Sequence, residues 1–171
     1  MASLVEELVN VLDAEKKKIY TTLVGYEERK KDVLIAADVT ALEEITTKEQ
    51  LAGDDLIAYS NQQIQILKDI ATVLGRTDGK MTVTRLISLL DTQPKVQMQL
   101  TEARDSLLEA ANRMKSLSEQ NAVLIRQAIE LNEFDMTLFK SLRQAPETAN
   151  YDKSAYNTGS LLGGSGFDAT S

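Results

Sequence analysis

Apolar residues recur along the chain with the period of an α-helix. From Val5 to Val33 every seventh residue is apolar, which is the spacing of one helix face. Two further heptad rows run from Leu42 to Val73, and eight of their ten positions are apolar. Patterns of this kind are typical of long helices that pack lengthwise against one another. The chain is therefore expected to be all-α.

The first two helices have recognisable ends. The first is expected over about residues 3–36, because no proline or other strong breaker precedes Asp38. Thr40 and Glu43 have the spacing of a capping box at the start of the second helix, with Asp38 as the competing N-cap. Gly75 is expected to close the second helix.

The rest of the helical pattern predicts a short helix and one very long helix. Thr82 is expected to cap the short helix, and Pro94 suits the first turn of the long one. The long helix is expected to run to about Arg143, roughly 75 Å at 1.5 Å per residue. Its two heptad rows are Val96, Ala103, Ala110, Leu117, Leu124, Leu131 and Leu138, and Leu100, Leu107, Met114, Asn121, Ala128, Asp135 and Leu142.

These lengths predict an antiparallel helical hairpin to which a third long helix adds, forming an elongated coiled-coil-like bundle domain over residues 1–145. The last helix is longer than the hairpin by about 14 residues, or about 20 Å. Leftover apolar surface on a helix usually marks an interaction site. The alternative is that the protein's own tail, a second copy or the short helix covers this surface.

Residues 146–171 differ in composition from the rest of the chain, since Gly, Ser, Thr, Asn and Asp dominate them. Such a segment cannot bury enough apolar surface to fold alone, so a flexible, low-complexity tail is expected. It is either inert or a docking segment whose apolar anchors are Tyr151, Tyr156, Leu161, Leu162 and Phe167.

Composition excludes much chemistry. The 171 residues include no His and no Cys, so a histidine base, a thiol nucleophile, a disulfide and the usual zinc sites are all impossible. The net charge of −7 argues against nucleic acid, and no apolar run is long enough for membrane insertion. A non-enzymatic cytoplasmic protein without cofactor or metal is expected. An enzyme with a carboxylate-bound metal is the remaining catalytic alternative.

Two polar features have a structural and a functional interpretation. Glu49, Gln63, Asn121 and Asp135 interrupt the heptad rows, where they either specify register or line a partner surface. The segment 75–82 superficially resembles a phosphate-binding loop. It is one residue short between its glycines and has methionine where the metal-binding hydroxyl should stand, so a helix-ending turn is expected.

Several residues, taken in order, resemble the FlgN family of flagellar export chaperones over roughly residues 5–160. The resembling positions are Glu15, Tyr20 and Leu23 (E-x4-Y-x2-L), lysines 30 and 31, the turn at Asp38, Leu42, Ile45 and Glu49-Gln50, and the run Asn121, Leu124, Ile125, Ile129 and Asn132 (N-x-x-L-L-x-x-x-I-x-x-N). Tyr156 followed by Gly159 fits a tail pattern loosely. An arginine frequent late in the family's second helix is missing, with 61–63 near that place.

The resemblance implies a cytosolic chaperone that binds hook-associated (hook–filament junction) proteins, prevents their premature assembly and delivers them to the type III export gate. It implies gate docking through Tyr151 or Tyr156 and client binding by the last helix, whose candidate residues are Asn121, Leu124, Ile125, Ala128, Leu131, Phe134, Leu138, Phe139 and Leu142. The client's terminal amphipathic helix would be the contacting element. The alternative is a structural or scaffolding coiled-coil protein that self-associates, and a homodimer fits either hypothesis.

Overall fold

The computed structural model describes residues 1–76 and 78–144. The predicted tail, with Tyr151 and Tyr156, lies outside the described residues, so its boundary and flexibility stay predictions. The chain divides into two units, residues Met1–Leu124 and Ile125–Ser171. Each is described by itself below.

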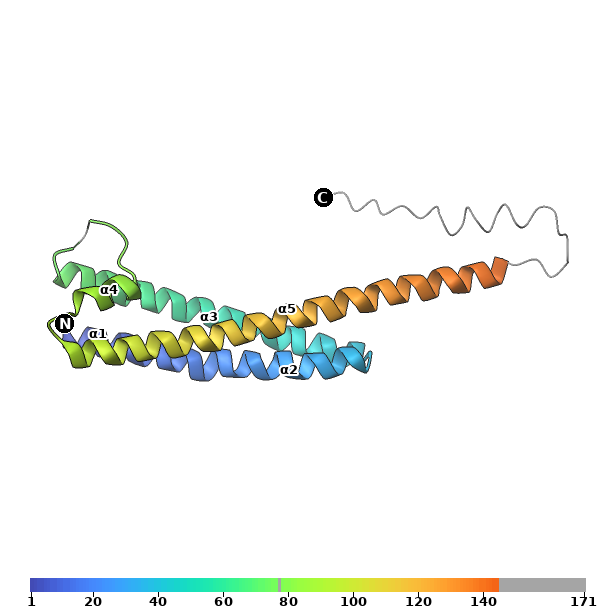
Figure 1. The fold of residues 1–171 in the computed structure, drawn as a ribbon, viewed down its shortest axis with the longest axis horizontal. Coiled ribbons are helices and arrows are strands. Elements are labelled where there is room, and N and C mark those ends of the chain that lie inside the picture. The colour runs from blue at the N-terminus through green and yellow to red at the C-terminus, as the bar shows by residue number, and fades with distance from the viewer. Residues whose placement is uncertain (77, 145–171) are drawn as a thin grey trace. The chain divides into compact units, whose positions relative to one another are not determined.

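Every regular element of the described residues is a helix, which confirms the predicted all-α class (Figure 1). The elements in chain order are α1 (Ala2–Glu15), a π-helical turn η1 (Lys16–Tyr20), α2 (Thr21–Ile35), α3 (Val39–Val73), α4 (Val83–Leu89) and α5 (Pro94–Gln144). The last of these has 51 residues and α3 has 35.

The first helix is not the uniform α-helix that its periodicity predicts, because η1 interrupts it. The Thr21 amide donates to the Lys16 carbonyl, the five-residue step of a π-turn. Buried residues are spaced by four from Glu15 through Ile19 and Leu23 to Glu27. In a regular α-helix such spacing drifts about 120° over three steps, so the wider turn helps to keep these residues on the inner face.

The turn between α2 and α3 corrects the predicted cap. Ala37 adopts a left-handed φ of 54°, and the Asp38 amide donates back to the Val33 carbonyl, which ends α2. Asp38 is then extended, and its carboxylate accepts from the Ala41 amide at 3.0 Å. Thr40 lies inside α3, so Asp38 caps this helix and the capping box does not form.

The other predicted helix ends are confirmed. Gly75 has a φ of 64° and its amide donates to the Thr72 carbonyl, while the next amide reaches the Ala71 carbonyl. The Thr82 hydroxyl accepts from the Arg85 amide at 3.1 Å and caps α4. These turns end α3 and start α4 within ten residues.

Side-chain contacts fix the direction of the helices in the first unit. Gln63 donates to Glu15, and the Lys30 Nζ lies 2.5 Å from the Glu49 Oε2. Residues later in the first helix therefore contact residues earlier in α3, so these helices form the predicted antiparallel hairpin. Lys16 donates to Ser106, and Asn121 donates to Glu27, so α5 runs parallel to the first helix.

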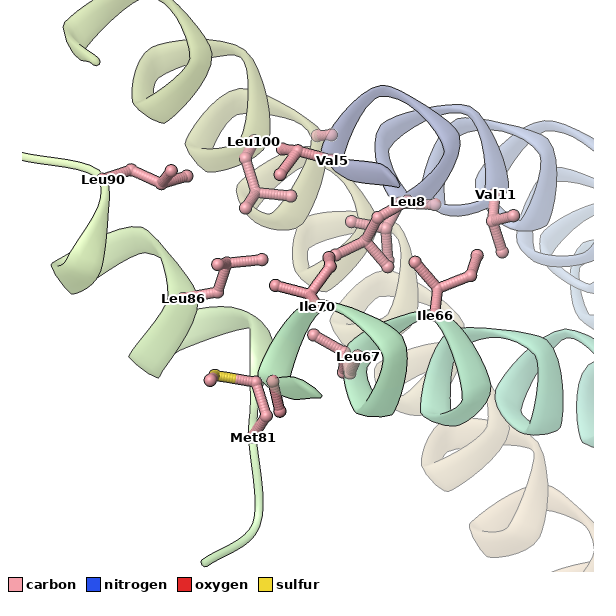
Figure 2. Packing of buried hydrophobic residues seen from close by; sticks show 13 residues of the cluster. Val5, Leu8, Val11, Ile66, Leu67, Ile70, Met81, Leu86, Leu90 and Leu100 are labelled. Carbon is pink, nitrogen blue, oxygen red and sulfur yellow. The ribbon is translucent and has the colours of Figure 1, made fainter. Parts of the chain in front are cut away.

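The main core of the first unit gathers side chains from four helices (Figure 2). Its most deeply buried members are Val5, Leu8, Leu12, Ile70, Leu86, Leu90 and Leu100. Full burial of one such side chain stabilises the fold by about 1.5–3 kcal/mol. A second, smaller cluster of Ile19, Leu23 and Ala52 lies nearer the α2–α3 turn. Polar contacts therefore take a larger share of the packing there.

Candidate protein-binding site

The two heptad rows of α5 change environment along the helix. Up to Leu124 every row position is buried or half-buried. Two of the buried positions are Leu100, at 0% exposure, and Asn121, at 3%. From Ala128 onward every row position is exposed. The same apolar spacing is therefore covered in one segment of α5 and uncovered in the next.

The uncovered positions form one face of the helix. At 100° per residue all five fall within an arc of about 80°, and four of the five are apolar. We call the exposed apolar surface made by these residues and two neighbouring phenylalanines the distal face. Its members are Ala128, Leu131, Leu138 and Leu142, flanked by Phe134 and Phe139. Its leucines are 46–67% exposed and its phenylalanines 55–63%. Surfaces of this kind on soluble proteins usually mark interaction sites.

The helix that carries the distal face has charged residues on its opposite side. Glu133 and Lys140 lie across the helix from its leucines, whereas Asp135 falls inside the apolar arc. The Arg143 guanidinium lies 5.1 Å from the centre of the Phe139 ring, a cation–π contact at the end of α5. Ile129 and Met136 are exposed on the other side of the helix, and the sequence did not mark either of them as a client-binding residue.

Three candidate residues are not fully exposed. Leu124 and Ile125 are half-buried. Asn121 is buried, and its Nδ2 donates to both the backbone carbonyl and the Oε2 of Glu27, each at 2.7 Å. Asn121 therefore acts inside the first unit, consistent with the register interpretation of polar heptad residues.

Glu27 connects Asn121 to a wider polar network. The Lys30 Nζ lies 3.8 Å from the Glu27 Oε1 and contacts Glu49, so two carboxylates share one cation. Burial raises the pKa of Glu49, and the hydrogen bond and charge of Lys30 partly offset this. Glu49 Oε1 has no hydrogen-bond partner among the described residues. Sequence reasoning did not single out Glu27, although Glu27 continues the inward spacing of four, and it noted Lys30 only as part of the family resemblance.

A second polar contact lies at η1. Glu15 is 5% exposed and accepts a hydrogen bond from Gln63. Burial raises the pKa of Glu15, and the Gln63 hydrogen bond only partly counters it. Burial, and secondly the Glu15 charge, raises the pKa of Tyr20. Glu15 is thus buried beside the π-turn with one side-chain hydrogen bond, which does not fully offset the cost of burying its charge.

Two other features are absent from the described residues. Residues 1–76 and 78–144 contain no group of three or more carboxylates placed to hold a metal ion. Within the same ranges no helix combines the length and the apolar character needed to span a membrane.

The comparisons with known proteins differ sharply in coverage. The chain is 31% identical over 98 residues to an alanine–tRNA ligase of Pseudoalteromonas translucida (strain TAC 125), which is 57% of this chain and 9% of the ligase. The chain spans less than a tenth of that enzyme, too little to show membership of its family. No solved structure matches the chain. The family model described as FlgN protein matches residues 1–159, nearly the whole chain, which therefore belongs to the FlgN family of flagellar export chaperones.

Proposed function

We propose that this chaperone is non-enzymatic, works in the cytoplasm and binds hook-associated proteins through the distal face of α5. Membership of the FlgN family supports a flagellar client. The observation that carries the site is the exposure of Leu131 and Leu138, which continue an apolar row that is covered earlier in the same helix.

The contacting element of the client is a terminal amphipathic helix. A single helix face with apolar residues three, seven and four residues apart, from Ala128 to Leu142, suits helix-against-helix packing, in which apolar side chains of the partner fill the spaces between them. Covering the client's own assembly helix in this way prevents premature polymerisation. Leu124 and Ile125, which precede the distal face along α5, are half-buried.

Delivery to the export gate is assigned to Tyr151 and Tyr156, which lie outside the described residues. Client binding and gate docking then reside in separate segments. A Tyr151→Ala, Tyr156→Ala variant should therefore retain its client while secretion of hook-associated proteins falls.

Leu131→Asp combined with Leu138→Asp tests the client site. Both side chains are at least 46% exposed, so the free chain should keep its helicity by circular dichroism. Two carboxylates in an apolar interface should weaken client binding by at least about 100-fold, measured by calorimetry with purified hook-associated proteins.

Thr137→Asp with Ser141→Asp is the matched control, because it adds the same two charges to the same segment outside the arc of the distal face. This control should bind the client within about threefold of the parent chain. Equal losses in both variants, or undiminished binding by the leucine variant, would show that the distal face is not the client site. Loss of a dimer rather than of client binding would favour the self-associating scaffold.

A further inference from the structure

The segment that superficially resembles a phosphate-binding loop lines an apolar groove instead. Gly79, Lys80, Met81 and Thr82 form one wall, and the last turns of α3 form the other. The groove encloses about 710 Å³. Its floor is buried and apolar, and Figure 2 shows Met81 beside the end of α3 that carries Leu67.

The apolar strip continues along α3 beyond the groove. Ile57, Ile64, Leu67 and Ala71 lie within about 80° of one another at 100° per residue. Ile57 is 61% exposed and Ile64 is 39% exposed. The strip runs from Ile57 to Ala71, a rise of about 21 Å, which is the length of roughly four helical turns. A helical segment of a partner matches that length better than a small molecule does.

The charge of the groove is opposite to that of the chain. Lys68 and Lys80 stand on its rim, and none of the described residues that line it is acidic. The chain as a whole carries −7. A second groove of similar volume, between α1 and α5, is lined by Glu6, Asp13 and Glu102 without any basic residue. Of these two grooves, the one beside α4 therefore combines an apolar floor with a cationic rim.

We propose that this groove, with the strip along α3, is a docking surface for an acidic amphipathic helix of a partner protein. Apolar side chains of the partner lie on Leu67, Ala71 and Met81, and its carboxylates face Lys68 and Lys80. Electrostatic complementarity of this kind selects the partner and speeds association. The surface shares no residue with the distal face, so binding to it can be measured separately from client binding.

The test uses the full chain and two labelled helical peptides of about 14 residues, both with leucines at i, i+3, i+4 and i+7. One carries glutamates at its flanking positions and the other carries lysines. Fluorescence anisotropy should show at least about tenfold tighter binding of the glutamate peptide, weakening as salt is added. Equal affinity for both peptides, or no binding of either, overturns the proposal.

Two variants locate the binding. Lys68→Glu with Lys80→Glu, and separately Ile57→Asp, should each weaken the glutamate peptide by at least about tenfold. The control Lys48→Glu with Lys115→Glu makes the same charge change at exposed residues outside the groove and should stay within about twofold. An equal loss in the control, or displacement of the peptide by inorganic phosphate alone, contradicts a helix-docking surface. Client binding should be the same in all three variants.

Discussion

Leu100 and Leu142 are the same residue type in the same heptad row of one helix, six heptads apart. Leu100 is 0% exposed and belongs to the core cluster that also holds residues of α1, α3 and α4, whereas Leu142 is 67% exposed. A heptad row therefore indicates which residues can be buried on one helix face, whereas their actual burial depends on whether other helices pack against that face. The uncovered part of this row is the surface that we propose for the client.

The largest effect that separates the two regions is expected from leucine truncation. Leu100→Ala should lower the free energy of unfolding by about 2–5 kcal/mol, because it leaves a cavity in the main core. Leu142→Ala should change it by no more than about 0.5 kcal/mol, since its side chain is already in water. Urea unfolding followed by circular dichroism measures both. Similar losses at the two positions would mean that Leu142 is covered in solution.

A buried and an exposed asparagine of α5 allow the same comparison for polar residues. Asn121→Ala removes the donor that serves both the carbonyl and the carboxylate of buried Glu27, so it should cost about 1–3 kcal/mol of unfolding free energy. Asn132→Ala, at an exposed position, should be nearly neutral. Thermal and urea unfolding of the pair provide the measurement. A stable Asn121→Ala protein would show that this contact does not hold α5 in register.

The smallest effect concerns buried Glu15 and exposed Asp135, and for Glu15 it depends on pH. The pKa of Glu15 is raised by burial, so the folded chain binds this proton more tightly than the unfolded chain does. Its favourable contribution is therefore complete at low pH and is lost as pH rises from the unfolded pKa through the raised folded pKa.

Glu15→Gln should consequently raise the free energy of unfolding at neutral pH by up to about 1 kcal/mol, with the gain vanishing in acid. The Gln63 hydrogen bond can persist to the new amide oxygen. Asp135→Asn, in the exposed part of the α5 rows, should change stability by a few tenths of a kcal/mol at most. Urea titrations between about pH 4 and 7.5 test both, and a Glu15→Gln gain that persists at low pH would exclude the burial effect.

Local signals in the sequence were enough for most of the architecture. Heptad spacing identified the helices, and Gly75, Thr82 and Pro94 marked ends that the structure confirms. These signals succeed because helix capping and backbone conformation depend on neighbours within one turn. The family was equally readable, since its pattern is spread in order over nearly the whole chain.

Contacts between distant segments decided the rest. The π-turn at η1 forms where Glu15, Ile19 and Leu23 must all face the hairpin, and Asp38 caps α3 because the left-handed Ala37 places it just outside the helix. The pairing of Asn121 with Glu27 joins residues 94 positions apart. The sequence alone was enough to predict where most helices begin and end, their order along the chain and the family. Only the tertiary structure decided which apolar and polar residues are covered, because burial is a property of the packed neighbours and not of the residue's own segment.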